Sequence, residues 1–470
     1  MFDPIPADSP DAMSGWERRH ADGQVRIVLA VLAAIVVLVL GLPAIYGTRA
    51  EHVYRDSIAQ LSGAGHGVRL ESYRRGWFSS QAVISVRVGG GAIVLVQHVH
   101  HGPVGFYNGG HLAFPVAAVV DTDPPVALEN AMDRVFGDTP IRISTVVAMD
   151  GDLDTYISRA QSEHTDPVSK IKAKFGGFNL EAHLAGDIQS IDGGGPGATA
   201  TGVFGEAQIA SLTIHARSHR DPQSTLWLGG GELKLARVSY SIVSGLTRAP
   251  GSGLMQDLRA SALTEIKNNR LDARESLSVG SLALGALQLK SSGLAMGVEN
   301  VLPQPVAEFS RAAISFAHSA PDRQIQSQAI QRQMVDAFVA IVKGSPVASL
   351  KMRIASAYGD ATGTANFTIS PELGNDPMLG SNEVERKDLI AQAWRKYGQA
   401  TVNFVAPAML IVHLTTADQL KRLEHNNVLV REGDNYVCRA TYRNGGWMVN
   451  GRKAGPPMPT ASSGIGSHTG

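Results

Sequence analysis

The feature that most constrains this chain is a long apolar run near its start. No charged side chain occurs from Ile27 to Tyr46, and the part up to Leu42 is almost entirely Val, Leu, Ile and Ala. As a helix rising about 1.5 Å per residue, such a run can cross a hydrocarbon layer of roughly 30 Å. A cleaved signal peptide usually has a shorter apolar core and a clear small-x-small site. The sequence therefore predicts an uncleaved transmembrane signal anchor over residues 25–47, although Gly47 and Ala50 leave cleavage open as an alternative.

The charges that flank this run are distributed asymmetrically. Arg18, Arg19 and Arg26 lie before it, whereas the arginines after it are partly offset by carboxylates: Arg49 and Arg55 are accompanied by Glu51 and Asp56. Because basic residues favour the cytoplasmic side of a membrane, we expect the N-terminus inside the cell. Residues 1–24, rich in Pro, Asp and Gly, are then a disordered cytoplasmic tail, and the chain after the anchor faces the periplasm or exterior.

Composition narrows the classes of fold and partner. The 470 residues carry 42 basic and 42 acidic side chains, a balance that gives no indication of nucleic-acid binding. Glycine is abundant, with 50 residues, and only 18% of residues are charged, which favours many tight turns between strands over long charged helices. Cys438 is the single cysteine, so neither an intramolecular disulfide nor a thiolate metal site can form within the chain.

Alternation of apolar and polar residues predicts a β-rich body after the anchor. Residues 81–88 and 350–355 alternate with the period of two that half-buried strands show. Similar runs occur at 92–99, 141–148, 177–184, 207–216, 232–241, 281–290 and 427–450. The expected fold class is β-rich α+β, in which a mainly antiparallel sheet body over 48–453 carries a few packed or capping helices. The last residues, 454–470, are expected to be a disordered tail because Pro, Ser and Gly dominate them.

Helical spacing interrupts the strand pattern in a few places. A juxtamembrane helix is expected over residues 50–63, and Arg323 to Val342 places apolar side chains three and four residues apart. Helical patches are also expected within residues 383–424, from Glu383 to Glu424, with interruptions near Gly398 and Pro407. These helices would cap or cross the sheet.

A segment rich in aromatic residues precedes the first strand. It contains Tyr73, Gly76, Trp77, Phe78, Ser79 and Ser80. A turn at Gly76 is expected to let the two following aromatic rings cover and bury the start of the sheet. Neither serine has the Gly-x-Ser-x-Gly frame of a nucleophile elbow, so a hydrolase remains the weaker interpretation.

Three further patterns are candidates for metal or phosphate sites. His98 and His100 share one face of a strand, as two zinc ligands would, but no third ligand is identifiable. Asp150, Asp152 and Asp154 resemble the start of a calcium loop, yet Thr155 and Gln161 stand where Gly and Glu are needed, and a solvated turn is expected instead. The glycine runs 193–195 and 229–231 lack phosphate-loop spacing and are expected to be loops. We therefore assign no catalytic, cofactor-binding or metal-binding residue and expect no enzyme.

Taken in order, these features resemble the YdgA-like family of bacterial membrane-anchored proteins of unknown function, domain of unknown function 945. The resemblance rests on the Tyr73 to Ser80 segment, on His101, Gly102 and Pro103, and on a C-terminal group: Gly433, Tyr436, Gly446, Asn450 and Gly451. A further match is Gly231, Glu232 and Leu233. The resemblance implies an inner-membrane protein with a periplasmic body and brings no catalytic residues with it.

Three functions follow as hypotheses. The first is a tethered, non-enzymatic envelope protein that binds an apolar ligand or lipid, or assists envelope assembly, because a sheet with one apolar face can hold an acyl chain. The second is a homo-oligomeric or protein-binding scaffold that uses its helices or sheet edges. The third and weakest is a periplasmic hydrolase or metal enzyme at Ser79, Ser80, His98 or His100.

Overall fold

A computed structural model of the chain describes residues 46–59, 62, 67–88, 91–108, 110–243, 251–285, 287–318, 324–370, 372–373 and 394–454. The predicted cytoplasmic tail, most of the predicted anchor and nearly all of the predicted C-terminal tail lie outside these ranges. Within them, no helix has both the length and the apolar character needed to cross a bilayer. The chain divides into two compact units, one of Met1–Asp123 with Ser144–Gly151 and one of Pro124–Ile143 with Asp152–Gly470.

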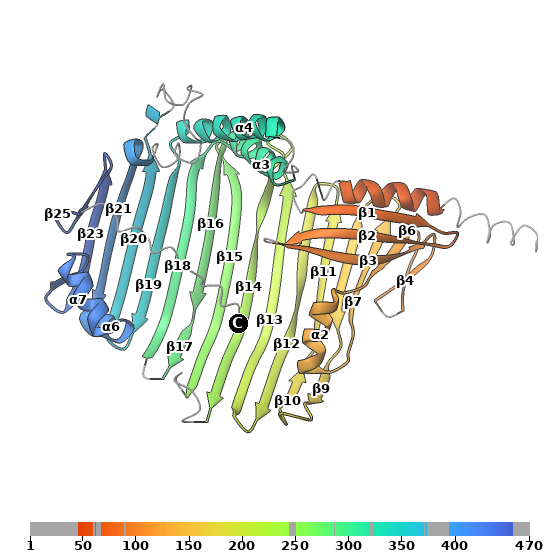
Figure 1. The fold of residues 1–470 in the computed structure, drawn as a ribbon, viewed down its shortest axis with the longest axis horizontal. Coiled ribbons are helices and arrows are strands. Elements are labelled where there is room, and N and C mark those ends of the chain that lie inside the picture. The colour runs from red at the N-terminus through yellow and green to blue at the C-terminus, as the bar shows by residue number, and fades with distance from the viewer. Residues whose placement is uncertain are drawn as a thin grey trace, which may run out of the picture. The chain divides into compact units, whose positions relative to one another are not determined.

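The first unit is an antiparallel sheet with a helix packed on one face. Neighbouring strands pair in the order β1, β2, β3, β6, β7. These strands are β1 (Val68–Arg75), β2 (Ser79–Val88), β3 (Gly91–His101), β6 (Val116–Thr122) and β7 (Ile141–Ala148). A separate hairpin joins β4 (Gly105–Tyr107) to β5 (His111–Ala113) between β3 and β6. Figure 1 shows the helix running along β1.

The helix over residues 46–59 forms where the juxtamembrane helix was expected. Its buried side chains, Ala50, Val53, Tyr54 and Ser57, follow the three- and four-residue spacing of one helix face. The Tyr54 hydroxyl donates to Gln97 of β3, which lies opposite the buried Ala82 of β2 and shares a strand face with the buried Val99. The burial of this apolar face explains why a short helix is stable here, since isolated helices of this length are marginal in water.

The second unit is a long run of antiparallel strands (Figure 1). The main pairing order is β8, β11, β12, β13, β14, β15, β16, β18, β19, β20, β21, β23, β24, β25. In addition, β10 joins β9 to β12, β17 lies between β15 and β18, and β22 pairs with β23. A β-rich α+β fold is thereby confirmed.

The bounds of the elements in the second unit are as follows. Its strands are β8 (Leu153–Arg159), β9 (Ser162–Thr165), β10 (Lys172–Phe175), β11 (Phe178–Ala185), β12 (Ile188–Gly202), β13 (Gly205–Arg220), β14 (Trp227–Ile242), β15 (Ser252–Lys267), β16 (Arg270–Val279), β17 (Ser281–Leu284), β18 (Leu287–Val301), β19 (Val347–Ser356), β20 (Gly359–Ile369), β21 (Gly398–Pro407), β22 (Val430–Glu432), β23 (Asn435–Arg443), β24 (Gly446–Val449) and β25 (Arg452–Lys453). Its helices are α2 (Val126–Phe136), α3 (Pro303–His318), α4 (Gln324–Lys343), α6 (Ala408–Leu414) and α7 (Ala417–His425).

In the second unit, helices that connect strands lie at both ends of the strands. Helices α3 and α4 connect β18 to β19, whereas α6 and α7 follow β21, which ends at the other end of the strands (Figure 1). The helix expected from Arg323 to Val342 is confirmed as α4. Helices α2 and α3 were not expected from the sequence.

Two expectations about loops and helices were wrong. Residues Gly398–Pro407, placed within a helical region, form strand β21. Its side chains alternate between two faces, with Ala400, Val402, Phe404 and Ala406 on one of them. Both glycine runs lie inside strands, 193–195 in β12 and 229–231 in β14. A Cβ atom at Gly194 would lie 2.1 Å from the carbonyl oxygen of Leu212, so close approach of neighbouring backbones explains the glycine.

Candidate functional site: an open apolar face

The register of the second unit aligns apolar side chains on one face of its sheet. Ile214 lies opposite Leu233, and Leu233 lies opposite Ala260 on the next strand. The same alignment continues from Ala260 to Leu277 and onward across the sheet. We call the two neighbouring rows that result the apolar stripe. Its first row is Leu180, Gly193, Ile214, Leu233, Ala260, Leu277, Leu294, Met352, Gly363, Phe404 and Cys438. Its second row is Ala182, Ile191, Ala216, Gly231, Ala262, Glu275, Met296, Leu350, Ala365, Val402 and Ala440.

The opposite face of the same strands is polar. Thr213 and Lys234 are cross-strand neighbours there, and Lys234 Nζ lies 2.8 Å from a carboxylate oxygen of Glu232. His215 pairs with Asp192, and Ser261 Oγ lies 2.7 Å from Ser276 Oγ. Because successive side chains of a strand point to opposite faces, the two faces differ in polarity across these strands, β12 to β16. A face that is apolar over this many strands requires a covering layer or a ligand.

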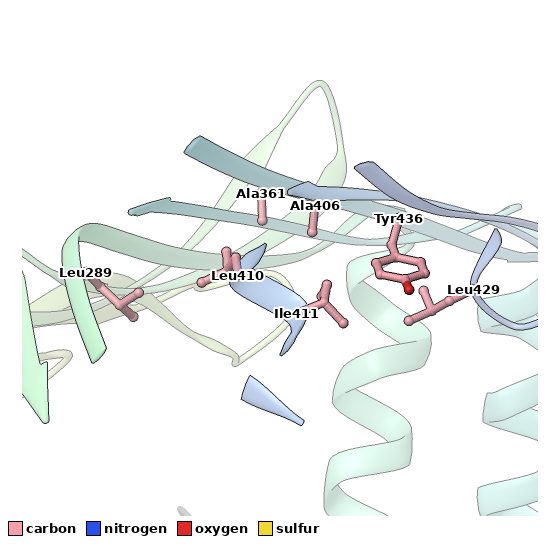
Figure 2. Packing of buried hydrophobic residues seen from close by; sticks show 7 residues of the cluster. All are labelled: Leu289, Ala361, Ala406, Leu410, Ile411, Leu429 and Tyr436. Carbon is pink, nitrogen blue, oxygen red and sulfur yellow. The ribbon is translucent and has the colours of Figure 1, made fainter. Parts of the chain in front are cut away.

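Helices cover the stripe's flank at one end of the strands. Leu410 and Ile411 of α6 pack against Ala361, Ala406 and Tyr436, which belong to the apolar face. Figure 2 shows these sheet side chains pointing toward the helix, with Leu429 beside the Tyr436 ring. Burial of this cluster fixes α6 on the sheet through the ordinary hydrophobic effect.

Helices α3 and α4 cover the flank at the other end. Val306 of α3 and Ile341 of α4 pack against a buried cluster of Leu228, Leu271 and Val301. Between these two helical layers the middle of the apolar face remains open. Leu277 and Met296 are both 45% exposed although they lie near the centre of the stripe.

The open part of the face contains two adjoining hollows. One of about 560 Å³ lies over β13 to β18 and is lined mainly by stripe residues, among them Ile214, Leu233 and Leu294. Four polar residues of the same strands also border it: His215, Glu232, Ser261 and Ser276. The other, of about 360 Å³, lies where α3 and α4 meet the sheet, beside Val298, Ala348 and Phe367. Both volumes are in the range of about 300–1,000 Å³ typical of small-molecule sites. The lining of both is predominantly apolar, so they are suited to hydrocarbon.

The stripe is much longer than it is wide. It runs across the strands from β11 to β23, and at about 4.8 Å between neighbouring strands its path along the sheet is roughly 48 Å. Helices limit it in the strand direction at both ends. Such a surface is suited to an elongated apolar ligand.

Two reactive side chains occur in the stripe. Glu275 places a carboxylate beside Met296 and Ala262, at the lining of the larger hollow. Cys438 is half-buried opposite Phe404, and burial raises the pKa of its thiol. A raised pKa keeps the thiol protonated near neutral pH, which disfavours a role as nucleophile.

In the first unit, the structure brings together the motif residues that lie after the predicted anchor. The amide of Gly76 donates to the carbonyl oxygen of Ser79 at 2.9 Å, which closes the expected turn. Ser80 Oγ lies 2.8 Å from His101 Nε2, and His101 Nδ1 lies 3.1 Å from the carbonyl oxygen of Trp77. Two segments that are separate in the sequence therefore meet at one buried imidazole.

Gly102 and Pro103 end strand β3 as expected. The peptide bond between them is cis, and the Gly102 amide donates to Ala117 at 2.9 Å. A Cβ atom at Gly102 would lie 1.8 Å from the carbonyl oxygen of Val116, so the backbone contact excludes any side chain. The expectation that Trp77 and Phe78 are buried was wrong, because they are 57% and 54% exposed.

The C-terminal motif residues hold the last strands of the second unit. Asn450, at φ 48°, accepts from the Arg439 amide at 2.8 Å and donates to the carbonyl oxygen of Asn427 at 2.8 Å. Gly451 follows with φ 78°, a left-handed conformation that glycine adopts without strain. The Tyr436 hydroxyl donates to Glu424 at 2.5 Å, which ties β23 to α7.

Comparison with known sequences agrees with this pattern over nearly the whole chain. Residues 24–457 match the family described as bacterial protein of unknown function, DUF945. The chain belongs to this family. It is 22% identical over 477 residues to Protein YdgA of Escherichia coli strain K12, covering 91% of this chain and 94% of that protein. No solved structure matches the chain.

In this DUF945 member the two candidate zinc ligands, His98 and His100, each contact a carboxylate. His98 Nε2 lies 3.3 Å from Asp123, and His100 Nε2 lies 3.3 Å from Asp121. The described part of the chain contains no group of three His, Cys, Asp or Glu side chains arranged to hold a metal ion. Asp154, the last residue of the calcium-like pattern, instead pairs with His183 across β8 and β11.

The contact between Ser80 and His101 resembles a nucleophile with its general base, but its surroundings differ from those of a hydrolase. Ser80 is 5% exposed and His101 7% exposed. The second imidazole nitrogen faces a backbone carbonyl where serine hydrolases place a carboxylate. Burial lowers the pKa of His101, and Gly47 of the helix lies directly over its ring. A substrate would reach the serine only if the helix moved.

Proposed function

We propose that this DUF945 protein is a non-enzymatic, membrane-anchored envelope protein whose apolar stripe binds the acyl chains of a lipid. The observation that carries the proposal is the open centre of the stripe, where Leu277 and Met296 remain 45% exposed between two helical layers. Monomeric proteins rarely leave a contiguous apolar patch of this extent in water. The uncharged run from Ile27 to Tyr46 supports an inner-membrane anchor with a periplasmic body, close to a source of lipid.

The shape of the stripe favours hydrocarbon chains over compact ligands. A compact ligand needs convergent polar groups, whereas the larger hollow is lined mainly by Ile, Leu, Ala and Met side chains. Neutral acyl chains can lie along the first row of the stripe, which carries no charged side chain, without leaving polar groups unpaired. Binding would shield the exposed apolar side chains, which gives a free-energy gain of about 25 cal/mol for each Å² covered.

Photo-crosslinking in cells tests the proposal. A photoreactive phenylalanine is introduced at Leu233 or Met296 on the stripe, with matched controls at Thr213 and Lys234 on the polar face. The proposal predicts phospholipid adducts, identified by mass spectrometry, at the stripe positions and none at the controls. Adducts to protein at the stripe with no lipid adduct would contradict it.

A homo-oligomeric scaffold is the second candidate, because another copy of the chain could cover the same exposed side chains. It predicts adducts of twice the chain mass at Leu233 and Met296. Since the same experiment reports both kinds of adduct, it separates the two functions directly.

A further inference from the structure

We infer that the first unit carries a second membrane contact, an exposed aromatic patch that rests in the interface of the bilayer holding the anchor. The patch consists of Trp77, Phe78, Val104, Phe106, Leu112 and Phe114, which are between 47% and 68% exposed. It uses different residues from the apolar stripe and a different unit of the chain. The inference rests on the proposed anchor, and flotation with bilayers distinguishes failure of the anchor from failure of the patch.

The patch is formed by two loops at one end of the unit's strands. Trp77 and Phe78 occupy the turn between β1 and β2, and the amide of His101 donates to the Phe78 carbonyl oxygen at 3.0 Å. The chain leaves β3 at this point and enters the β4–β5 hairpin. The amide of Val116 donates to the Pro103 carbonyl oxygen at 3.0 Å, so the base of the hairpin is held at the same strand end.

The hairpin presents its apolar side chains outward. Phe106 and Leu112 are cross-strand partners, and they are 65% and 62% exposed. Gly105 fixes the hairpin against β6, because a Cβ atom there would lie 2.2 Å from the Val119 side chain. Phe114, 68% exposed, follows β5 directly and is separated from β6 by Pro115. A short strand pair with one apolar and solvent-facing side is suited to insertion at a lipid interface.

The point at which the predicted anchor joins the first unit identifies the lipid bilayer as the partner of the patch. The first described residues of the helix, Tyr46 and Gly47, are the last two of the predicted anchor. Gly47 lies against the His101 ring, and Arg75, at the end of β1, donates to Thr48 Oγ1 at 3.2 Å. The anchor therefore enters the unit at the same strand end as the patch. A bilayer that holds the anchor lies within reach of these aromatic side chains.

The chemistry of the patch agrees with a lipid interface. Trp is enriched at the headgroup level of membranes, and Trp, Phe and Leu form the apolar side of segments that lie in the membrane interface. Arg74 and Arg75 are exposed beside the turn, where their positive charge favours contact with anionic lipid headgroups. Together with the anchor, the patch would hold the first unit in one orientation on the membrane.

Depth measurement by spin labelling tests the inference with the full chain. Phe106 and Phe114 are replaced singly by Cys in a Cys438→Ala background and labelled with a nitroxide. Val94 is the matched control, because it is 59% exposed on the same unit but lies toward the opposite strand end, paired with Ser85. The protein is reconstituted into bilayers of phosphatidylcholine and phosphatidylglycerol in equal parts, and collision with oxygen is compared with collision with a water-soluble nickel chelate.

The inference predicts that the ratio of oxygen to nickel collisions is severalfold higher at Phe106→Cys and Phe114→Cys than at Val94→Cys. Equal ratios at all three sites, in protein that floats with the bilayers, would overturn the patch and leave the anchor intact. Shielding from both reagents at Phe106→Cys would indicate a protein partner and also overturn it. Failure of the full chain to float with the bilayers would refute the anchor itself, and with it this inference.

Discussion

Ser80 Oγ lies 2.8 Å from His101 Nε2, and this contact connects the two motif segments that follow the predicted anchor. The imidazole accepts from the serine hydroxyl when its other nitrogen donates to the Trp77 carbonyl oxygen, 3.1 Å away. Gly47 of the helix packs on the same ring, where a Cβ atom would lie 2.7 Å from Nδ1. One imidazole thus links the helix, the β1–β2 turn and the end of β3.

Ser80→Ala is expected to destabilise this part of the first unit. It leaves His101 Nε2 buried without its partner, which costs about 1–3 kcal/mol. Hydrogen exchange of the β2 and β3 amides in the full chain measures the change. Ser79→Ala, at the exposed neighbouring position, should change exchange little. Equal effects of the two substitutions would show that the contact to His101 contributes nothing.

The stability of the same region is expected to fall in mild acid. Burial is the main cause that holds the pKa of His101 below its ordinary value, and the charges of Arg75 and His100 act in the same direction. The unfolded state, with a pKa of about 6.5, then binds more protons than the folded state. Stability is complete above that pH and decreases as the pH falls through it toward the folded pKa. Hydrogen exchange of β3 across this range should show the decrease, and His101→Gln should abolish it.

Tyr54→Phe is expected to loosen the helix from the sheet. The Tyr54 hydroxyl donates to Gln97 Oε1, and Gln97 Nε2 donates to Thr122 Oγ1 at 2.9 Å. Loss of the hydroxyl leaves the buried amide oxygen without a donor and costs about 1–3 kcal/mol. Exchange of amides in residues 46–59 measures this change. In the double variant with Gln97→Met the two costs should not add, because the orphaned oxygen is also removed; full additivity would exclude direct coupling.

Leu233→Glu is expected to reduce the lipid that purifies with the protein by at least about tenfold, since a carboxylate on the stripe must lose its water or exclude the acyl chain. Thr213→Glu, on the polar face of the neighbouring strand, is the control and should leave the amount unchanged. Quantitative mass spectrometry of extracted lipids gives the comparison. A similar loss in both variants, or in neither, would count against binding at the stripe.

Asp133→Ala is expected to destabilise the attachment of α2. The side chain of Arg159 is fully buried, and its Nη2 lies 3.2 Å from Asp133 and 2.7 Å from the Gly137 carbonyl oxygen. Removing the carboxylate leaves a buried charge with reduced compensation, at a cost of about 3 kcal/mol. Proteolysis within residues 126–140 should become faster. The exposed Asp138→Ala provides the control, and equal cleavage of both variants would refute the role of the ion pair.

Local patterns predicted most of the strands correctly, because the alternation of side chains reflects which face of each strand is buried. The runs at 81–88, 141–148 and 350–355 all lie within strands β2, β7 and β19. Residues 281–290 were predicted as one strand, but the chain turns at Gly285, φ 57°, to form β17 and β18. Glycine was the main source of error in placing strands and loops, because this residue type permits a turn at Gly285 but a close contact between strands at Gly194.

The sequence by itself determined the uncharged run, the β-rich class, the Gly76 turn and the end of β3, because each depends on neighbouring residues and their periodicity. Only the tertiary structure decided which side chains share a face. Strand register places Leu233 beside Ile214 and Ala260, and it brings Ser80 to His101, across separations that no local pattern encodes. It also decided that Trp77 and Phe78 are exposed. Exposure depends on what packs against a residue, and this is a property of the folded chain as a whole.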